Sequence, residues 1–265
     1  MHNCLMIPFK IVIPARYAST RLPGKPLQKL NGKPLIEHVY NAASTSNATE
    51  IIVATDNREI FETVTSFGGT AVMTRDDHPS GTDRIHEVVC IQNWDQSTIV
   101  VNLQGDEPLV NTENIHSLVD LLANNPSADM ATLAAPFKSI TDVVNPNNVK
   151  VVIDNNNFAL YFSRAPIPWV RDSFNTDILT NPKATLPNVP FYSHIGLYVY
   201  RAKTLQQFSL LKPSQLELAE SLEQLRILSN GMKIMVKIIK DSVAHGVDTQ
   251  ADLVAVEKIL QERNK

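Results

Sequence analysis

The chain has 265 residues, of which 43% are hydrophobic, and 24 Lys and Arg against 27 Asp and Glu give it a formal net charge of -3. This length and apolar content suit one large α/β domain with a sizeable core. A near-neutral chain with a single local cluster of cations disfavours a nucleic-acid-binding protein, which usually presents a basic face. No apolar run is long enough for a membrane span, and residues 1–10 do not resemble a signal peptide. With only two, isolated cysteines, we expect a cytoplasmic protein without disulfides.

The first half of the chain alternates predicted strands with predicted helices. Short β-branched runs predict strands at 10–14, 50–54, 70–73, 98–103 and 129–134. Amphipathic patterns predict helices at 35–46, 58–67, 82–92 and 113–124. This alternation is typical of βαβ units, which form a mostly parallel sheet through right-handed crossovers.

The second half has a different rhythm. Two short strands, 149–153 and 158–162, flank an Asp-Asn-Asn-Asn turn and predict a hairpin. Residues 165–190 are rich in Pro, Asn and Thr and predict a long loop. A strand at 192–200, a helix at 216–228, a strand at 233–239 and a closing helix at 251–262 follow. We interpret 135–210 as a subdomain inserted into a single domain that spans residues 1–265.

The most informative segment follows the first predicted strand. The apolar run ends at Pro14, and a loop with Arg16, Arg21 and Lys25 comes next. Gly24 allows a tight turn there. Because the loops after parallel strands meet at the ligand-binding edge of α/β sheets, these cations favour phosphate binding, with a nucleoside triphosphate as the candidate ligand. The alternative is a solvated basic loop, and neither a Walker A motif nor a Gly-x-Gly-x-x-Gly turn is present.

Two aspartates are candidate magnesium ligands. Asp106 follows the predicted strand at 98–103 in the motif Gln104-Gly-Asp-Glu-Pro, and Asp248 precedes the last helix in His245-Gly-Val-Asp-Thr. Carboxylates at such positions can hold Mg²⁺ against a triphosphate. The alternative is that each aspartate caps the helix that follows it, with Asp252 supporting the cap in the second case.

Two further groups of polar residues are weaker signals. Ser80 and Thr82 are candidate helix caps on either side of Gly81, at a helix N-terminus that could bind anions or base carbonyls. The second half supplies an arginine for a carboxylate and several partners for hydroxyls, which together suit a sugar acid. These are Arg164, His194, Tyr198, Glu223 and Gln224.

Taken in order, these motifs resemble those of the 3-deoxy-manno-octulosonate cytidylyltransferases, also called CMP-Kdo synthetases. The resemblance runs from about Lys10 to Glu262. Its strongest parts are Ile13-Pro-Ala-Arg-Tyr-Ala-Ser-Thr-Arg-Leu-Pro-Gly-Lys-Pro and Val101-Asn-Leu-Gln-Gly-Asp-Glu-Pro, with Ser80-Gly-Thr-Asp-Arg, Tyr161-Phe-Ser-Arg, His194-Ile-Gly-Leu-Tyr, Leu222-Glu-Gln-Leu-Arg and Gly246-Val-Asp-Thr in support. The resemblance implies a Rossmann-like nucleotidyltransferase fold, similar to glycosyltransferase A. That fold is a three-layer sandwich with a mostly parallel sheet and an inserted dimerisation subdomain.

The resemblance also implies an activity and a site. The activity is transfer of CMP from CTP to Kdo (3-deoxy-D-manno-octulosonate) for lipopolysaccharide synthesis, by a Mg²⁺-dependent homodimer. The implied nucleotide site comprises Pro14, Ala15, Arg16, Ser19, Arg21, Lys25, Arg75, Ser80, Gly81 and Thr82. The implied Kdo pocket comprises Gln104, Arg164, His194, Tyr198, Glu223 and Gln224. Asp106 and Asp248 would hold the metal, and catalysis would fall to Arg16, Arg21, Lys25, Asp106 and Asp248.

Three alternatives remain open at this point. The first is a cytidylyltransferase for sialic acid or a related keto-deoxy acid. The second is a non-catalytic nucleotide-binding protein on the same fold. The third is a glycosyltransferase, which the lack of an Asp-x-Asp motif disfavours.

Overall fold

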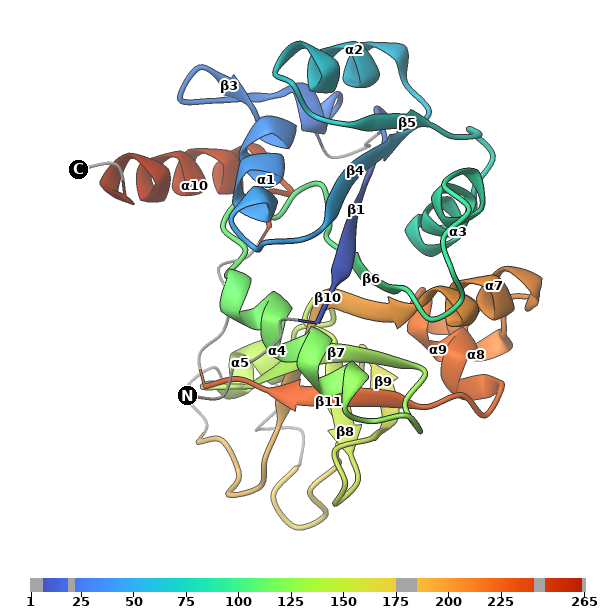
Figure 1. Cartoon of the computed structure of the whole chain (residues 1–265). Helices are drawn as coiled ribbons and strands as arrows, with labels where there is room; N and C mark the ends of the chain where they lie inside the picture. The colour runs from blue at the N-terminus through green and yellow to red at the C-terminus, as the bar shows by residue number, and fades with distance from the viewer. Residues whose placement is uncertain (1–6, 19–21, 175–184, 241–245, 264–265) are drawn as a thin grey trace, which may run out of the picture.

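The structure is a computed structural model (Figure 1). It describes residues 7–18, 22–174, 185–240 and 246–263. The strands are β1 (Phe9–Ala15), β2 (Lys29–Leu30), β3 (Lys33–Pro34), β4 (Glu50–Thr55), β5 (Ala71–Met73), β6 (Ile99–Asn102), β7 (Met130–Pro136), β8 (Lys150–Ile153), β9 (Ala159–Ser163), β10 (Tyr192–Arg201) and β11 (Ile234–Ile238). The helices are η1 (Lys25–Leu27), α1 (Leu35–Ser44), α2 (Arg58–Ser66), α3 (Gly81–Ile91), α4 (Thr112–Ala123), α5 (Ile140–Val144), α7 (Ala202–Leu210), α8 (Gln215–Glu220), α9 (Gln224–Ser229) and α10 (Gln250–Arg263).

The main sheet has the strand order β11-β7-β10-β6-β1-β4-β5 within the described residues, and the β8–β9 hairpin joins it through β10. β1 pairs in parallel with both β4 and β6, and β11 pairs in parallel with β7. β10 is antiparallel to its neighbours β6 and β7. The expectation of a mostly parallel sheet is therefore confirmed, with antiparallel pairing at the central strand β10 and in the β8–β9 hairpin.

Helices cover both faces of the sheet, because successive residues of a buried strand point to opposite sides. On β1, Ile11 and Ile13 pack in one core cluster with residues of α1, α2, α4 and α10. Val12 packs in the other cluster with residues of α3, α7 and α9. The sheet between these two helical layers is visible in Figure 1. The predicted three-layer α/β arrangement is thus present.

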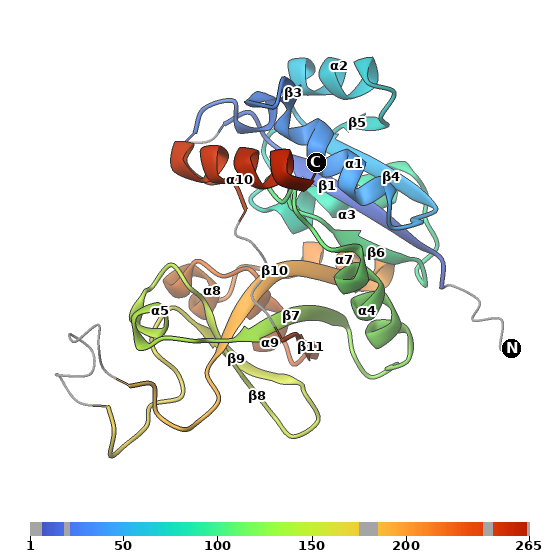
Figure 2. The ribbon, with the colours of Figure 1, turned by 90° about the vertical axis from the view of Figure 1, so that its left-hand side faces the viewer.

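The section expected to form an inserted subdomain contains α5, the β8–β9 hairpin and a small apolar cluster that includes Phe137, Phe174 and Phe191. In Figure 2, α5, β8 and β9 lie at the end of the molecule opposite α2. Asn157 adopts a positive φ of 63° in the hairpin turn, as its Asn-rich sequence predicts. β10, from the same section, belongs to the main sheet. The limits of an inserted unit at about 135–210 stay a prediction.

The prediction of a single helix over residues 216–228 is wrong. The chain forms α8, turns at Ser221, and then forms α9. Ser221 has φ 52° and ψ 50°, a left-handed conformation that ends an α-helix. Neither Gly nor Pro marks this break in the sequence, so periodicity alone missed it. The break has a consequence for the site, because Ser221, Glu223 and Gln224 all line one cavity.

None of the helices in the part of the chain that the structure describes is long and apolar enough to cross a membrane.

Candidate functional site

The site begins where the C-terminal ends of β1 and β6 lie side by side. Leu103 donates its backbone N–H to the carbonyl of Val12 at 3.1 Å, so the chain after β6 continues along β1. A Cβ added to Gly105 would lie only 2.9 Å from the carbonyl oxygen of Pro14. Glycine at position 105 therefore lets the Gln-Gly-Asp-Glu-Pro motif approach the first motif closely.

Two carboxylates from distant parts of the sequence meet at this edge around one lysine. Lys25 Nζ donates to Asp106 Oδ2 at 2.6 Å and to Asp248 Oδ1 at 2.9 Å. The backbone N–H of Val247 donates to the carbonyl of Asp106 at 2.8 Å, which holds the two aspartate-bearing segments together. A Cβ on Gly246 would lie 3.0 Å from that same carbonyl oxygen, so glycine permits this contact.

The helix-capping alternative does not hold for either aspartate. The side chain of Asn111, not Asp106, caps α4 by accepting a hydrogen bond from the backbone of Glu113. At the start of α10, Thr249 Oγ1 accepts from the backbone of Asp252 at 3.2 Å, and the Asp252 carboxylate accepts from the backbone of Thr249 at 2.8 Å. Asp252 supports the cap as expected, but Thr249 holds the cap position.

Two cavities share this edge. The smaller, of about 320 Å³, is lined by Pro14, Ala15, Arg16, Ala18, Lys25, Pro26, Gln104, Gly105, Asp106 and Asp248. The larger, of about 870 Å³, contains in its lining all six residues assigned to the Kdo pocket: Gln104, Arg164, His194, Tyr198, Glu223 and Gln224. Gln104, Asp106 and Asp248 line both cavities. The two aspartates therefore lie where the smaller cavity, which contains Arg16 and Lys25, meets the larger polar cavity.

Expected nucleotide-binding residues divide into three groups. Pro14, Ala15, Arg16 and Lys25 line the smaller cavity. Ser80, Gly81, Thr82 and Arg75 belong to α3 and the loop before it, outside the described lining of both cavities. Ser19 and Arg21 lie outside the described residues.

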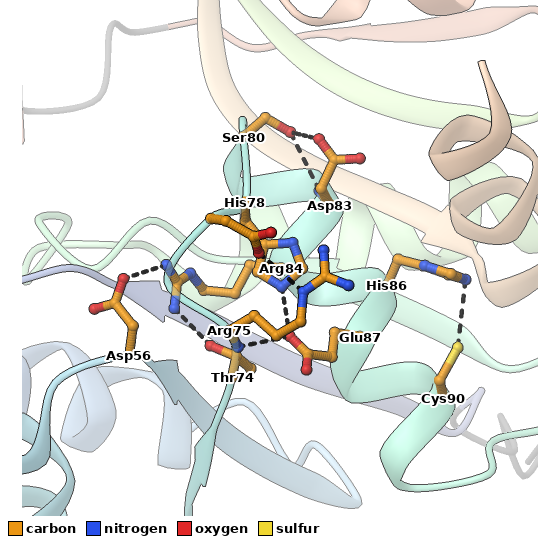
Figure 3. A network of polar contacts seen from close by, with 11 residues as sticks. Asp56, Thr74, Arg75, His78, Ser80, Asp83, Arg84, His86, Glu87 and Cys90 are labelled. Carbon is orange, nitrogen blue, oxygen red and sulfur yellow. Dashed lines mark hydrogen bonds and ion pairs between the residues drawn. The ribbon is translucent and has the colours of Figure 1, made fainter. Parts of the chain in front are cut away.

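The N-terminus of α3 is fixed by its own polar network (Figure 3). Ser80 caps the helix by accepting from the backbone N–H of Asp83 at 3.2 Å, as predicted. The buried Arg84 donates to Asp56 at 2.6 Å and so ties α3 to the loop after β4. The side chain of Arg75 donates to Asp77 at 2.9 Å. This network holds the segment against β1, where Gly81 faces the ring of Pro14.

His194 and Tyr198 lie on the same side of β10, as strand alternation predicts, with ring centroids 5.4 Å apart. Burial lowers the pKa of His194 to about 3, so its ring is neutral, and Nε2 lies 3.0 Å from Thr132 Oγ1. Tyr198 donates to Gln224 Oε1 at 3.3 Å. Gln224 Nε2 is buried and has no hydrogen-bond partner among the described residues. An unpaired buried amide is costly, so this donor is suited to a bound ligand.

Part of the hydrogen-bonding capacity of the Arg164 guanidinium is used by backbone carbonyls. The guanidinium donates to the carbonyls of Glu220, Pro146 and Ser221 at 2.6, 3.1 and 3.4 Å. These three bonds leave two of the five guanidinium N–H groups for another acceptor. The neighbouring Lys150 Nζ donates to three carbonyls, including that of Arg164. Both cations thereby fix the wall of the larger cavity.

Glu223 lines the larger cavity and contacts the N-terminal turn of α3. Burial raises the pKa of its carboxyl, while hydrogen bonds from Thr82 and Ser80 act in the opposite direction. An expected acceptor residue and two expected nucleotide residues are thus in contact.

Sequence reasoning missed several residues of the larger cavity. Glu107 was part of a quoted motif but was given no role. Burial, with the nearby charges of Asp106 and Asp248, raises its pKa to about 8. Asn147, Asn148, Ser221 and Thr249 also line the cavity, and Lys150 supports it. Asn147, Asn148 and Ser221 come from loops without a recognisable spacing, so only their place in the fold reveals them.

Comparisons with known proteins agree with this geometry. Residues 10–234 match the family model described as cytidylyltransferase. The chain is 47% identical over 256 residues to a 3-deoxy-manno-octulosonate cytidylyltransferase of Pseudoalteromonas translucida (strain TAC 125), covering 97% of this chain and 99% of that protein. A solved structure of CMP:2-keto-3-deoxy-manno-octonic acid synthetase complexed with CTP superposes with a TM-score of 0.86 at 40% identity, covering 97% of this chain and 100% of that one. The resemblance inferred from the motifs is confirmed. The chain belongs to the cytidylyltransferase family, among its 3-deoxy-manno-octulosonate cytidylyltransferases, and is a nucleotidyltransferase.

Proposed function

We propose that this protein transfers CMP from CTP to Kdo and releases pyrophosphate, as a cytoplasmic homodimer that activates Kdo for lipopolysaccharide synthesis. One observation carries the proposal: Asp106 and Asp248 stand at the junction of two cavities, which have the linings expected for a triphosphate and for a sugar acid. The relatives named for this activity match almost the whole chain and support the assignment.

The smaller cavity is assigned to the triphosphate. Arg16 and Lys25 line it and would neutralise phosphate oxygens, with Arg21 and Ser19 of the same loop added by their place in the motif. Arg75 and the N-terminal turn of α3, from Ser80 to Thr82, would bind the cytidine through side-chain and backbone groups.

Asp106 and Asp248 fit a magnesium site. Mg²⁺ is commonly held by one or two carboxylates together with substrate phosphates, not by a complete protein cage. The described residues match this pattern in that these two carboxylates converge within 3 Å of one ammonium. Mg²⁺ bound there would neutralise phosphate charge and lower the pKa of the attacking hydroxyl.

The larger cavity is assigned to Kdo. The two free N–H groups of Arg164 would bind its carboxylate. Gln104, His194, Tyr198, Glu223 and Gln224 would bind its hydroxyls, with the unpaired Nε2 of Gln224 as a ready donor. In the reaction, the anomeric oxygen of Kdo forms a bond to the α-phosphorus of CTP, and the bond to the β-phosphate breaks. The side chains act by orienting both substrates and neutralising charge.

Pyrophosphate release tests the proposal. We expect release with CTP and Kdo, and much less when UTP or ATP replaces CTP or when sialic acid replaces Kdo. A preference for sialic acid would instead indicate a related cytidylyltransferase. CTP binding without release from any acceptor would indicate a non-catalytic nucleotide-binding protein. Light scattering at several concentrations tests the homodimer.

A further inference from the structure

The ammonium of Lys25 occupies the space between the two aspartates. It contacts an oxygen of each, at 2.6 Å and 2.9 Å, and the Lys25 side chain is only 16% exposed. Its ammonium serves as a counterion of two carboxylates that would otherwise repel each other.

A magnesium ion held by Asp106 Oδ2 and Asp248 Oδ1 would compete with Lys25 for the same two oxygens. Mg²⁺ needs its oxygen ligands at about 2.0–2.1 Å in near-octahedral geometry. An ion at that distance from both Oδ atoms would share the space now filled by Nζ, and the two cations would repel each other. Binding of the metal to these two oxygens thus requires Lys25 to move away from them.

The structure provides Lys25 with another place to go. Its side chain also lines the smaller cavity, beside Arg16. A triphosphate in that cavity would offer several charged oxygens, and the flexible four-carbon stem of lysine can move between partners.

We propose that Lys25 is the resident counterion of Asp106 and Asp248 in the free enzyme and is exchanged for Mg²⁺ when the triphosphate binds. The proposal rests on the proposed function, since it takes the two aspartates as the metal site. It adds that the free enzyme binds metal weakly and that nucleotide binding creates the metal site. By linkage, metal and nucleotide then strengthen each other's binding.

The first experiment compares Mg²⁺ binding to nucleotide-free wild type and Lys25→Met by calorimetry. The variant keeps the apolar stem and removes the charge. We expect Lys25→Met to bind Mg²⁺ about tenfold more tightly than wild type, within the usual range for coupled sites. We also expect Mg²⁺ to raise its melting temperature far more than that of wild type, because the metal replaces the lost counterion. Lys10→Met is the matched control, since it removes another partly buried lysine that pairs with a carboxylate, Glu50, at 2.6 Å. Equal Mg²⁺ affinity in wild type and Lys25→Met would overturn the proposal.

A second experiment does not depend on the folding of Lys25→Met. Nucleotide-free wild type and Asp106→Asn should bind Mg²⁺ with similarly low affinity, because Lys25 already occupies the site. Tight binding by free wild type that Asp106→Asn abolishes would overturn the exchange, while leaving the proposed activity intact. Failure of the wild-type enzyme to release pyrophosphate from CTP and Kdo would instead contradict the proposed function.

Discussion

Lys25 Nζ and Asp106 Oδ2 lie 2.6 Å apart although 81 positions separate the two residues in the sequence. The parallel pairing of β1 with β6 explains this closeness, since it brings the ends of both strands to one edge of the sheet. The sequence motif after each strand contributes one partner. This contact joins the basic loop to the carboxylates.

Asp106→Asn should reduce pyrophosphate release by about 10²–10³-fold or more, because a carboxylate that would hold the proposed metal ion against the phosphates is lost. CTP binding should largely survive, since the cationic loop remains. Turnover and calorimetric CTP binding measure the two effects. Asp95→Asn, on an exposed turn, is the control. Near-normal turnover in Asp106→Asn would refute the metal role.

Arg164→Ala should raise the KM for Kdo by about ten- to a hundredfold, the effect of losing charge-assisted hydrogen bonds. The KM for CTP should change little. Arg164→Lys should recover little, because one ammonium cannot replace the donors to Glu220, Pro146 and Ser221 and also bind a carboxylate. Steady-state kinetics with each substrate varied gives the answer, and equal effects on both constants would place Arg164 outside the acceptor pocket.

Gly105→Ala should lower the free energy of unfolding by about 1–3 kcal/mol, because its Cβ would collide with the backbone oxygen of Pro14. Activity should fall too, since the collision would displace the neighbouring Asp106 from its place between the two cavities. Gly196→Ala is the control for stability, because a Cβ there meets no atom within 4 Å among the described residues. Urea unfolding measures both variants. Equal stabilities would show that the close approach of the two motifs is not needed.

Acid should destabilise the protein through His194. Burial lowers the pKa of this ring in the folded state to about 3, from an ordinary 6.5. Between these values the unfolded chain binds a proton that the folded chain does not, so this stability is present above the unfolded pKa and is lost as the pH falls. The loss amounts to about 2 kcal/mol between pH 8 and pH 5. His194→Asn should therefore lose less stability over this range than wild type.

Urea unfolding at each pH measures the effect of His194. His38→Asn, on α1 and outside the lining of the two cavities, is the control. An identical pH dependence in wild type and His194→Asn would show that another group causes the acid sensitivity.

Local sequence was sufficient for most elements. The alternating strands and helices of the first half and the Asn-rich hairpin formed as predicted, because their patterns are set by neighbouring residues. The helix over 216–228 failed for the opposite reason. Ser221 takes a left-handed conformation that serine seldom adopts by itself, and the surrounding contacts, including Arg164 to its carbonyl, accompany the turn. That break brings Glu223 and Gln224 to the cavity.

The sequence by itself supplied the candidate residues of the site: a basic loop, two aspartates in separate motifs, and a set of polar residues suited to a sugar acid. It also determined the family, since several motifs occur in a fixed order. Only the tertiary structure excluded the capping role of each aspartate, because Asn111 and Thr249 hold the cap positions that the sequence left open. Likewise, only the fold placed Lys25 between the two carboxylates. Contacts between residues far apart in the chain depend on strand pairing, and no local pattern encodes their distance.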